Sequence, residues 1–229
     1  MPRKARILLP NTPHHIVQRG HNRQVVFTKP GDFQYYLRNL VEWKQMLGIK
    51  IYSFCLMTNH IHLVAEPDED TTSLSKLLKR LAGKQTRFVN KREGRTGTLW
   101  EGRFKASPIE RDAYLLQCCR YVERNPVTAK MVAKPAEYPW SSYRHRIGEH
   151  QLSWLDDFVL YESLGNNKSK RIERYRRFVE CDHDSEHAFI QRAVQKNQLT
   201  GSSMFINKVE LFTGIRIEHR DQGRPAEKK

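Results

Sequence analysis

The sequence predicts an α+β fold built on an antiparallel sheet, and three observations support this. Short apolar runs alternate with segments of helical spacing, in the order strand, helix, strand, strand, helix, strand. That order is the ferredoxin-like βαββαβ arrangement, and a further helix follows its last strand. Beyond about residue 150 the chain is helical in pattern and rich in charge, so we expect a helical C-terminal region after the sheet.

The first half of the arrangement is a strand, a helix and a second strand. Residues 14–19 form the first predicted strand. Asp32 is the expected N-terminal cap of a helix that runs to about Leu47, and Gly48 ends that helix. Residues 49–57 are almost uninterruptedly apolar and aromatic, which indicates a buried strand.

The second half begins with a tight hairpin. Thr58-Asn59 is a short polar connection that leads into a strand over residues 60–65. A helix begins near Thr72, with apolar residues at i, i+3, i+4 and i+7. Residues 98–109 form the fourth expected strand, and the added helix covers about residues 111–124. We expect the two inner helices on one face of the sheet, with the other face left available.

Length, charge and cysteine content limit the possible functions. The 229 residues allow one main domain, expected at 1–150, and a helical, basic accessory region, expected at 151–229. Lys and Arg outnumber Asp and Glu by 40 to 25, a formal charge of +15 that is typical of proteins that bind polyanions such as nucleic acid. No run approaches the roughly 18 apolar residues of a membrane span, and the cysteines have no disulfide or zinc spacing. We therefore expect a cytoplasmic protein with no membrane partner.

The tripeptide His60-Ile61-His62 indicates metal chemistry. Alternate side chains of a strand share a face, so His60 and His62 can present two imidazole nitrogens to one divalent cation. Two histidines are too few for a closed structural zinc site, which leaves positions for water and a phosphate oxygen. The alternative is an ordinary pair of exposed strand histidines without a ligand.

Tyr121 is the candidate nucleophile. It shares one face of the added helix with Asn125, at the edge of that helix's apolar stripe and outside the core packing. A phenol has a pKa of ~10, so attack on a phosphate at neutral pH needs proton removal or a polarising cation. Asn125 is a candidate third metal ligand, although Pro126 favours a helix end there. The alternative for Tyr121 is a boundary aromatic with a hydrated hydroxyl.

Several spaced motifs resemble one known family. His60-Ile61-His62 fits the His-hydrophobic-His motif of HUH single-strand nucleases. Segments 18–24, 99–105, 120–127 and 140–143 resemble the single-tyrosine transposases, most closely the REP-associated tyrosine transposases. The resemblance covers about residues 5–145.

The resemblance implies a DNA strand transferase with a catalytic domain at 1–150. Tyr121 would attack a phosphate of single-stranded DNA beside hairpins of repetitive extragenic palindromes, forming a 5′-phosphotyrosine and freeing a 3′-hydroxyl. Mg²⁺ or Mn²⁺ would bind His60, His62 and Asn125. Both a monomer and a dimer remain open.

Two sets of basic residues are candidate DNA contacts. The second helix carries a basic row that we expect on the sheet face opposite the histidines, where it would hold a duplex stem; a solvated charged face is the alternative. The second set, expected nearer the reactive site, comes from the first turn and the fourth strand. The row is Lys76, Arg80, Lys84, Arg87 and Lys91, and the second set is Arg19, Arg23, Arg103 and Lys105.

Four weaker features complete the sequence. Trp100 and Phe104 either stack on bases or fill the core. The basic run 168–177 is a further candidate for backbone contacts, and the polar tail 223–229 only faintly resembles a minor-groove arm. Segment 181–187 mixes Cys, Asp and His without a zinc spacing, so we interpret it as a polar loop.

Two other functions remain open from the sequence. A non-catalytic nucleic-acid-binding module can share this sheet topology, and for it the hydroxyl of Tyr121 would be dispensable. A metal-dependent hydrolase that uses water would cleave DNA without a covalent adduct.

Overall fold

The sheet has the predicted topology. The computed structural model describes residues 6–181 and 184–217. Its four strands are β1 (His14–Arg19), β2 (Lys50–Met57), β3 (His60–Glu66) and β4 (Lys105–Pro108). They pair antiparallel in the order β2-β3-β1-β4, which confirms the ferredoxin-like arrangement.

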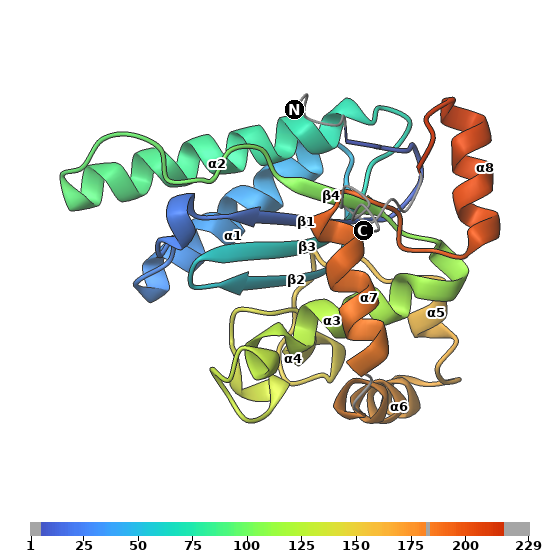
Figure 1. Cartoon of the computed structure of the whole chain (residues 1–229). Coiled ribbons are helices and arrows are strands. Elements are labelled where there is room, and N and C mark those ends of the chain that lie inside the picture. Colours follow the sequence, from blue (N-terminus) through green and yellow to red (C-terminus); the bar gives the residue numbers. More distant parts are fainter. Residues whose placement is uncertain (1–5, 182–183, 218–229) are drawn as a thin grey trace, which may run out of the picture.

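One face of the sheet carries the two inner helices, as expected. These are α1 (Pro30–Met46) and α2 (Thr72–Glu93), which lie together along that face (Figure 1). Leucines spaced along α2 meet the inward side chains of the strands, among them Ile16, Leu63 and Ala106. This apolar core joins the sheet to the two helices and leaves the basic row of α2 on the outside.

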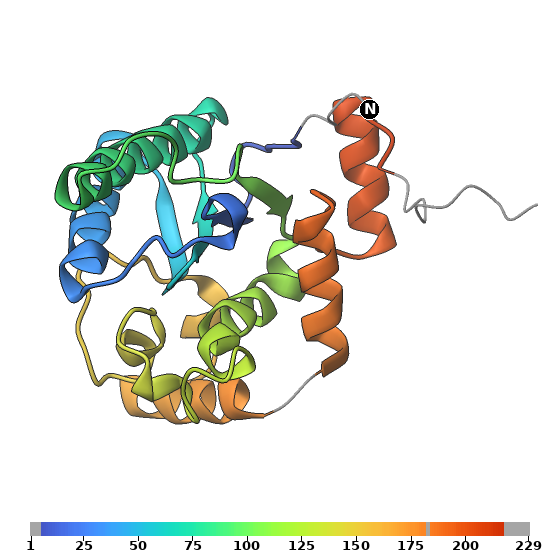
Figure 2. The same cartoon turned by 60° about the vertical axis from the view of Figure 1, so that its left-hand side comes forward.

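The second face is covered, so the expectation of an open face is wrong. α3 (Arg111–Thr128) packs over β2 and β3, α6 (Lys168–Glu180) packs against α3, and α7 (Asp184–Gln195) lies over β1 and β4. Figure 2 shows these helices on the side of the sheet away from α1 and α2. Tyr52, Val122 and Tyr175 belong to the apolar cluster that joins these elements.

Short elements complete the fold. The single-turn helices η1 (His21–Arg23) and η2 (Pro135–Glu137) follow β1 and α3. Beyond η2 the chain adds α4 (Tyr143–Arg146), α5 (Val159–Glu162) and α8 (Ser203–Thr213), and the expected basic run lies on α6. Within the described residues, no helix is long and apolar enough to cross a membrane. The tail 223–229 and residues 182–183 of the expected polar loop lie outside the described residues.

The fourth strand is shorter than predicted. Residues 98–104 run as an irregular segment beside the end of β1, joined to it by a single bridge between Gly20 and Trp100. Gly102 has φ of 61°, a left-handed conformation that interrupts an extended strand. Trp100 is 4% exposed and its indole Nε1 donates to Ala82 O, so this tryptophan fills the core rather than stacking on bases.

Two helix boundaries also differ from expectation. α1 begins at Pro30, and Asp32 therefore lies inside the first turn, where its carboxylate accepts from the backbone N–H groups of Thr28 and Lys29. α3 continues through Pro126 to Thr128 instead of ending near Arg124. In both cases hydrogen bonds to one polar side chain decide where the helix begins or how far it continues.

Candidate active site

The two histidines of β3 lie side by side, as the strand period requires. Their ring centroids are 4.8 Å apart. The register of β1 on β3 sets Arg19 opposite His60 and Val17 opposite His62. Because all four side chains project from the same face, the positively charged side chain of Arg19 lies directly beside the histidine pair.

Tyr121 of α3 lies against His62 of this pair. Its ring centroid is 5.8 Å from that of His62 and 5.2 Å from that of His15 on β1. The side chain is 5% exposed and belongs to the core cluster, so its predicted place outside the core packing is wrong. Burial raises the pKa of the Tyr121 phenol above its usual 10, which keeps the phenol protonated at neutral pH.

The chemistry of the two histidines fits a divalent cation. His60 Nδ1 lies 2.6 Å from Asn59 Oδ1 and His62 Nδ1 lies 2.9 Å from His15 Nε2. With each Nδ1 engaged, Nε2 is the ring nitrogen left to meet a metal, and His62 Nε2 is buried without a hydrogen-bond partner among the described residues. Burial lowers the pKa of His60 to about 4 and that of His62 well below its usual value. Both rings are therefore neutral at neutral pH, as metal ligands must be.

Asn125 compensates for a proline within α3. Pro126 has no N–H to offer Val122 O, and the Asn125 side-chain Nδ2 donates instead, to Tyr121 O at 2.7 Å and to Val122 O at 3.4 Å. These bonds explain why the helix continues where Pro126 was expected to end it. They use the amide nitrogen of Asn125 and leave its oxygen for another partner. Among the described residues no three His, Cys, Asp or Glu side chains form a metal-binding group, so any third protein ligand would be of another type.

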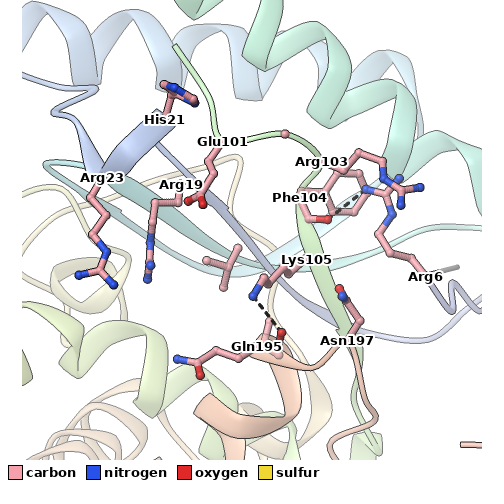
Figure 3. Close-up of a pocket in the computed structure, with 13 residues that line it drawn as sticks. Arg6, Arg19, His21, Arg23, Glu101, Arg103, Phe104, Lys105, Gln195 and Asn197 are labelled. Carbon is pink, nitrogen blue, oxygen red and sulfur yellow. Dashed lines mark hydrogen bonds between the residues drawn. The ribbon is translucent and has the colours of Figure 1, made fainter. Parts of the chain in front are cut away.

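A basic cleft of about 800 Å³ is lined by Arg19, the residue opposite His60 in the sheet (Figure 3). Its walls come from β1, η1, the segment before β4 and the end of α7. The structure brings all four residues of the second basic set into this one cleft: Arg19, Arg23, Arg103 and Lys105. Several lining residues were missed from the sequence, among them Arg6 and His21. Arg6 stacks its guanidinium 3.8 Å from the Phe104 ring centroid, and His21 lies on η1.

The C-terminal region also reaches the site. His187 of α7 lies with its ring centroid 4.6 Å from that of Tyr121. Arg120, next to Tyr121 on α3, pairs with Glu186, and Lys105 Nζ donates to Gln195 O at 2.9 Å. Interpreting segment 181–187 as a polar loop therefore missed a residue that touches the candidate nucleophile. No spacing in the sequence indicates this contact, because it depends on the packing of α7 against α3.

The basic row of α2 lies on the far side of the sheet from the histidines, as expected. Lys76 pairs with Asp70 at 2.9 Å and Lys84 with Glu42 at 3.0 Å. Arg80 lies over the Trp43 ring, 5.0 Å from its centroid. The other two residues of the row, Arg87 and Lys91, form no ion pair with any residue in the described part of the chain. About half of the row is thus available to an external anion.

Comparisons with known proteins agree with the motifs. Residues 9–125, just over half of the chain, match the family described as IS200-like transposase. The fold is that of a REP-associated tyrosine transposase solved bound to a REP hairpin, with a TM-score of 0.57, 14% identity, and coverage of 69% of this chain and 99% of that one. These two findings confirm the resemblance drawn from the sequence.

A second solved structure is less similar. It is a putative transposase from Deinococcus radiodurans, 17% identical over 54% of this chain and 97% of that chain, with a TM-score of 0.36. A likeness at that level carries no argument about fold. Among curated proteins, none matches this chain significantly.

Proposed function

This chain belongs to the IS200-like transposase family, and from that premise we propose that it nicks and transfers single-stranded DNA through a covalent bond to Tyr121. The proposal assigns the chemistry to residues 1–150 and an accessory role to residues 151–229. One observation carries it: the rings of Tyr121 and His62, 59 residues apart in sequence, lie with centroids 5.8 Å apart in the fold, and His60 lies beside His62.

The proposed step is a transesterification. The Tyr121 oxygen forms a bond to the scissile phosphorus as the bond to the 3′-oxygen of the neighbouring nucleotide breaks. The products are a 5′-phosphotyrosine and a free 3′-hydroxyl, which takes up the proton that the phenol loses. Because the phosphodiester bond is exchanged and not hydrolysed, a second 3′-hydroxyl can reverse the step and join a new strand.

Mg²⁺ or Mn²⁺ fits this site. We assign His60 Nε2, His62 Nε2 and Asn125 Oδ1 as its protein ligands. A cation there supplies electrostatic stabilisation of the charge that develops on the phosphate oxygens. The protein's own contribution is to hold neutral imidazoles at the pair and to bring the phenol against them.

The two basic surfaces support a DNA substrate that has both a single-stranded part and a duplex stem. Arg19, which lies opposite His60 in the sheet, lines the cleft together with Arg23 and Arg103, and this cleft suits a single strand. The row on α2 lies on the opposite side of the sheet and suits the backbone of a duplex stem. Since the structurally similar transposase was solved with a REP hairpin, we propose REP-type hairpins as the substrate class here.

Covalent capture tests the proposal. We would incubate 5′-labelled and 3′-labelled single-stranded hairpin DNA with the protein and Mn²⁺, denature, and measure label on the protein. The expected result is an adduct that carries the 3′-side fragment, is lost in Tyr121→Phe and falls at least about 100-fold in His60→Ala. Tyr114→Phe, on the same helix, is the matched control and should keep the adduct.

The two other functions give different outcomes. Cleavage without an adduct would identify a hydrolase that uses water. Tight DNA binding without cleavage, unchanged by Mn²⁺ and by Tyr121→Phe, would identify a binding module. Either outcome would contradict the proposed function.

A further inference from the structure

We propose that His15 is a positioning residue that holds His62 in the tautomer and orientation needed for metal binding. The inference rests on the proposed function, because it concerns the same cation site. It goes beyond the candidate site predicted from the sequence, in which His15 was only a residue of the first strand.

The contacts of His15 connect both halves of the site. Its Nε2 lies 2.9 Å from His62 Nδ1, and the two rings meet edge to edge, with centroids 5.2 Å apart and planes 19° apart. The His15 and Tyr121 rings meet at a steep angle, with centroids 5.2 Å apart and planes at 68°. His15 is fully buried, so it cannot act by contacting the DNA strand itself. A single side chain therefore touches both a candidate ligand and the candidate nucleophile.

The hydrogen bond between the His15 and His62 rings has two possible senses, because either nitrogen can be the donor. If His62 Nδ1–H donates to His15 Nε2, the lone pair of His62 is on Nε2, where a metal can bind. If His15 Nε2–H donates instead, His62 carries its proton on Nε2 and cannot coordinate there. Each sense leaves one buried N–H without an acceptor among the described residues, on His15 Nδ1 or on His62 Nε2. Binding of a cation at His62 Nε2 requires the first sense, and His15 Nε2 then supplies the acceptor for the His62 Nδ1–H.

His60, the other candidate metal ligand on β3, has an equivalent hydrogen-bond partner in Asn59. His60 Nδ1 lies 2.6 Å from Asn59 Oδ1, an oxygen that can only accept, so His60 must carry its proton on Nδ1. Asn59 and His15 thus serve the two histidines in the same way, from the hairpin and from the adjacent strand. Partners of this kind typically contribute 10- to 100-fold to metal affinity.

Mn²⁺ binding in the absence of DNA tests the inference. Titration followed by electron paramagnetic resonance would compare the wild type with His15→Phe, which keeps a ring but has no nitrogen, and with His15→Gln, which keeps a polar acceptor. We expect Mn²⁺ affinity to fall about 10- to 100-fold in His15→Phe and less in His15→Gln. His14→Gln is the matched control: His14 is adjacent and buried, but its Nε2 accepts from Leu9 N in a different environment, so Mn²⁺ affinity should not change.

A second measurement reports the tautomer directly. Long-range ¹H–¹⁵N spectra at one Mg²⁺ concentration, chosen just to saturate the wild type, should show the His62 proton on Nδ1 in the wild type. The same spectra of His15→Phe should show a mixture of tautomers, because its weaker site is only partly occupied. Equal Mn²⁺ affinity in the wild type and His15→Phe, with His62 in one tautomer in both, would overturn the inference. If His15→Phe does not fold, His15→Gln is compared with His15→Met, which offers no strong acceptor, and equal affinities of these two would overturn it.

Failure of the proposed function looks different. If the wild type does not bind Mn²⁺, or if His60→Ala binds it as tightly as the wild type does, then no cation site exists at His60 and His62. In that case the proposed chemistry fails, and the inference fails with it. Loss of affinity in His60→Ala with no change in His15→Phe would contradict only the role of His15.

Discussion

Ser142 Oγ lies 2.6 Å from Glu123 Oε1, a buried hydrogen bond that ties α3 to the turn before α4. Glu123 also accepts from Tyr175 of α6 at 2.8 Å and from Ser53 of β2 at 3.3 Å. Glu123 is two residues from Tyr121, so it projects about 200° around the helix from the candidate nucleophile. These bonds fix the rotation of α3 and thereby the direction in which Tyr121 points.

Loss of the Ser142 hydroxyl should destabilise the fold. Ser142→Ala removes the shortest bond to Glu123 and a bond to Phe54 N at 3.0 Å, and leaves a buried carboxylate short of a donor. We expect the free energy of unfolding to fall by about 1–3 kcal/mol, measured by urea denaturation. Ser141→Ala is the control, because Ser141 Oγ makes only one long bond, 3.5 Å to Tyr138 O. Equal losses in the two variants would contradict this account.

The buried carboxyl of Glu123 should make stability depend on pH. Burial raises its pKa above the ordinary 4.5, although the hydroxyl donors and Arg146 oppose the shift. The folded state therefore favours the protonated form, and the contribution of this group is full below pH about 4.5 and is lost as pH rises through its folded pKa. Glu123→Gln does not titrate, so its stability relative to the wild type should improve with rising pH and then level off. Urea midpoints from pH 4 to 8 measure this; a constant or declining difference would contradict it.

Gly20 should not tolerate a side chain. A Cβ there would lie 2.3 Å from Gln24 O and 2.9 Å from Val26 Cγ2, in the turn that carries Arg19 and Arg23 into the cleft. We expect Gly20→Ala to lower the free energy of unfolding by about 1–3 kcal/mol. Gly31→Ala is the control, since nothing lies within 4 Å of that position in the first turn of α1, and it should be neutral or stabilising. Thermal unfolding compares them, and a tolerated Gly20→Ala would refute the close approach.

The two basic surfaces should respond differently to the form of the DNA. Arg103→Ala, in the cleft, should weaken binding of both an unstructured strand and a hairpin. For the strand, the slope of log K against log salt should become less negative by about 0.7, because one phosphate contact is lost. Arg87→Ala, on α2, should weaken binding of the hairpin only. Fluorescence anisotropy between about 50 and 200 mM salt measures both. A loss of strand binding in Arg87→Ala equal to that in Arg103→Ala would contradict separate roles.

Local sequence pattern predicted the element order well, and part of the site with it. His60 and His62 had to share a face because the strand period is two, and no other part of the fold is needed for that conclusion. The row on α2 was placed on the correct side of the sheet because its apolar neighbours face the core. The errors came where one residue outweighs the pattern: Gly102 interrupts the predicted fourth strand, and Asn125 allows α3 to continue through Pro126.

Composition and short-range spacing were enough to establish the charge, the order of the sheet strands and inner helices, the histidine pair and the motifs of the transposase family. The folded molecule was needed to show that His15 bonds to His62, that α7 sets His187 against Tyr121, and that the second sheet face is covered. These contacts depend on strand register and on helix packing between segments 47 to 66 residues apart. Such contacts arise only when the whole core closes, and a local pattern carries no information about which distant side chain will meet it.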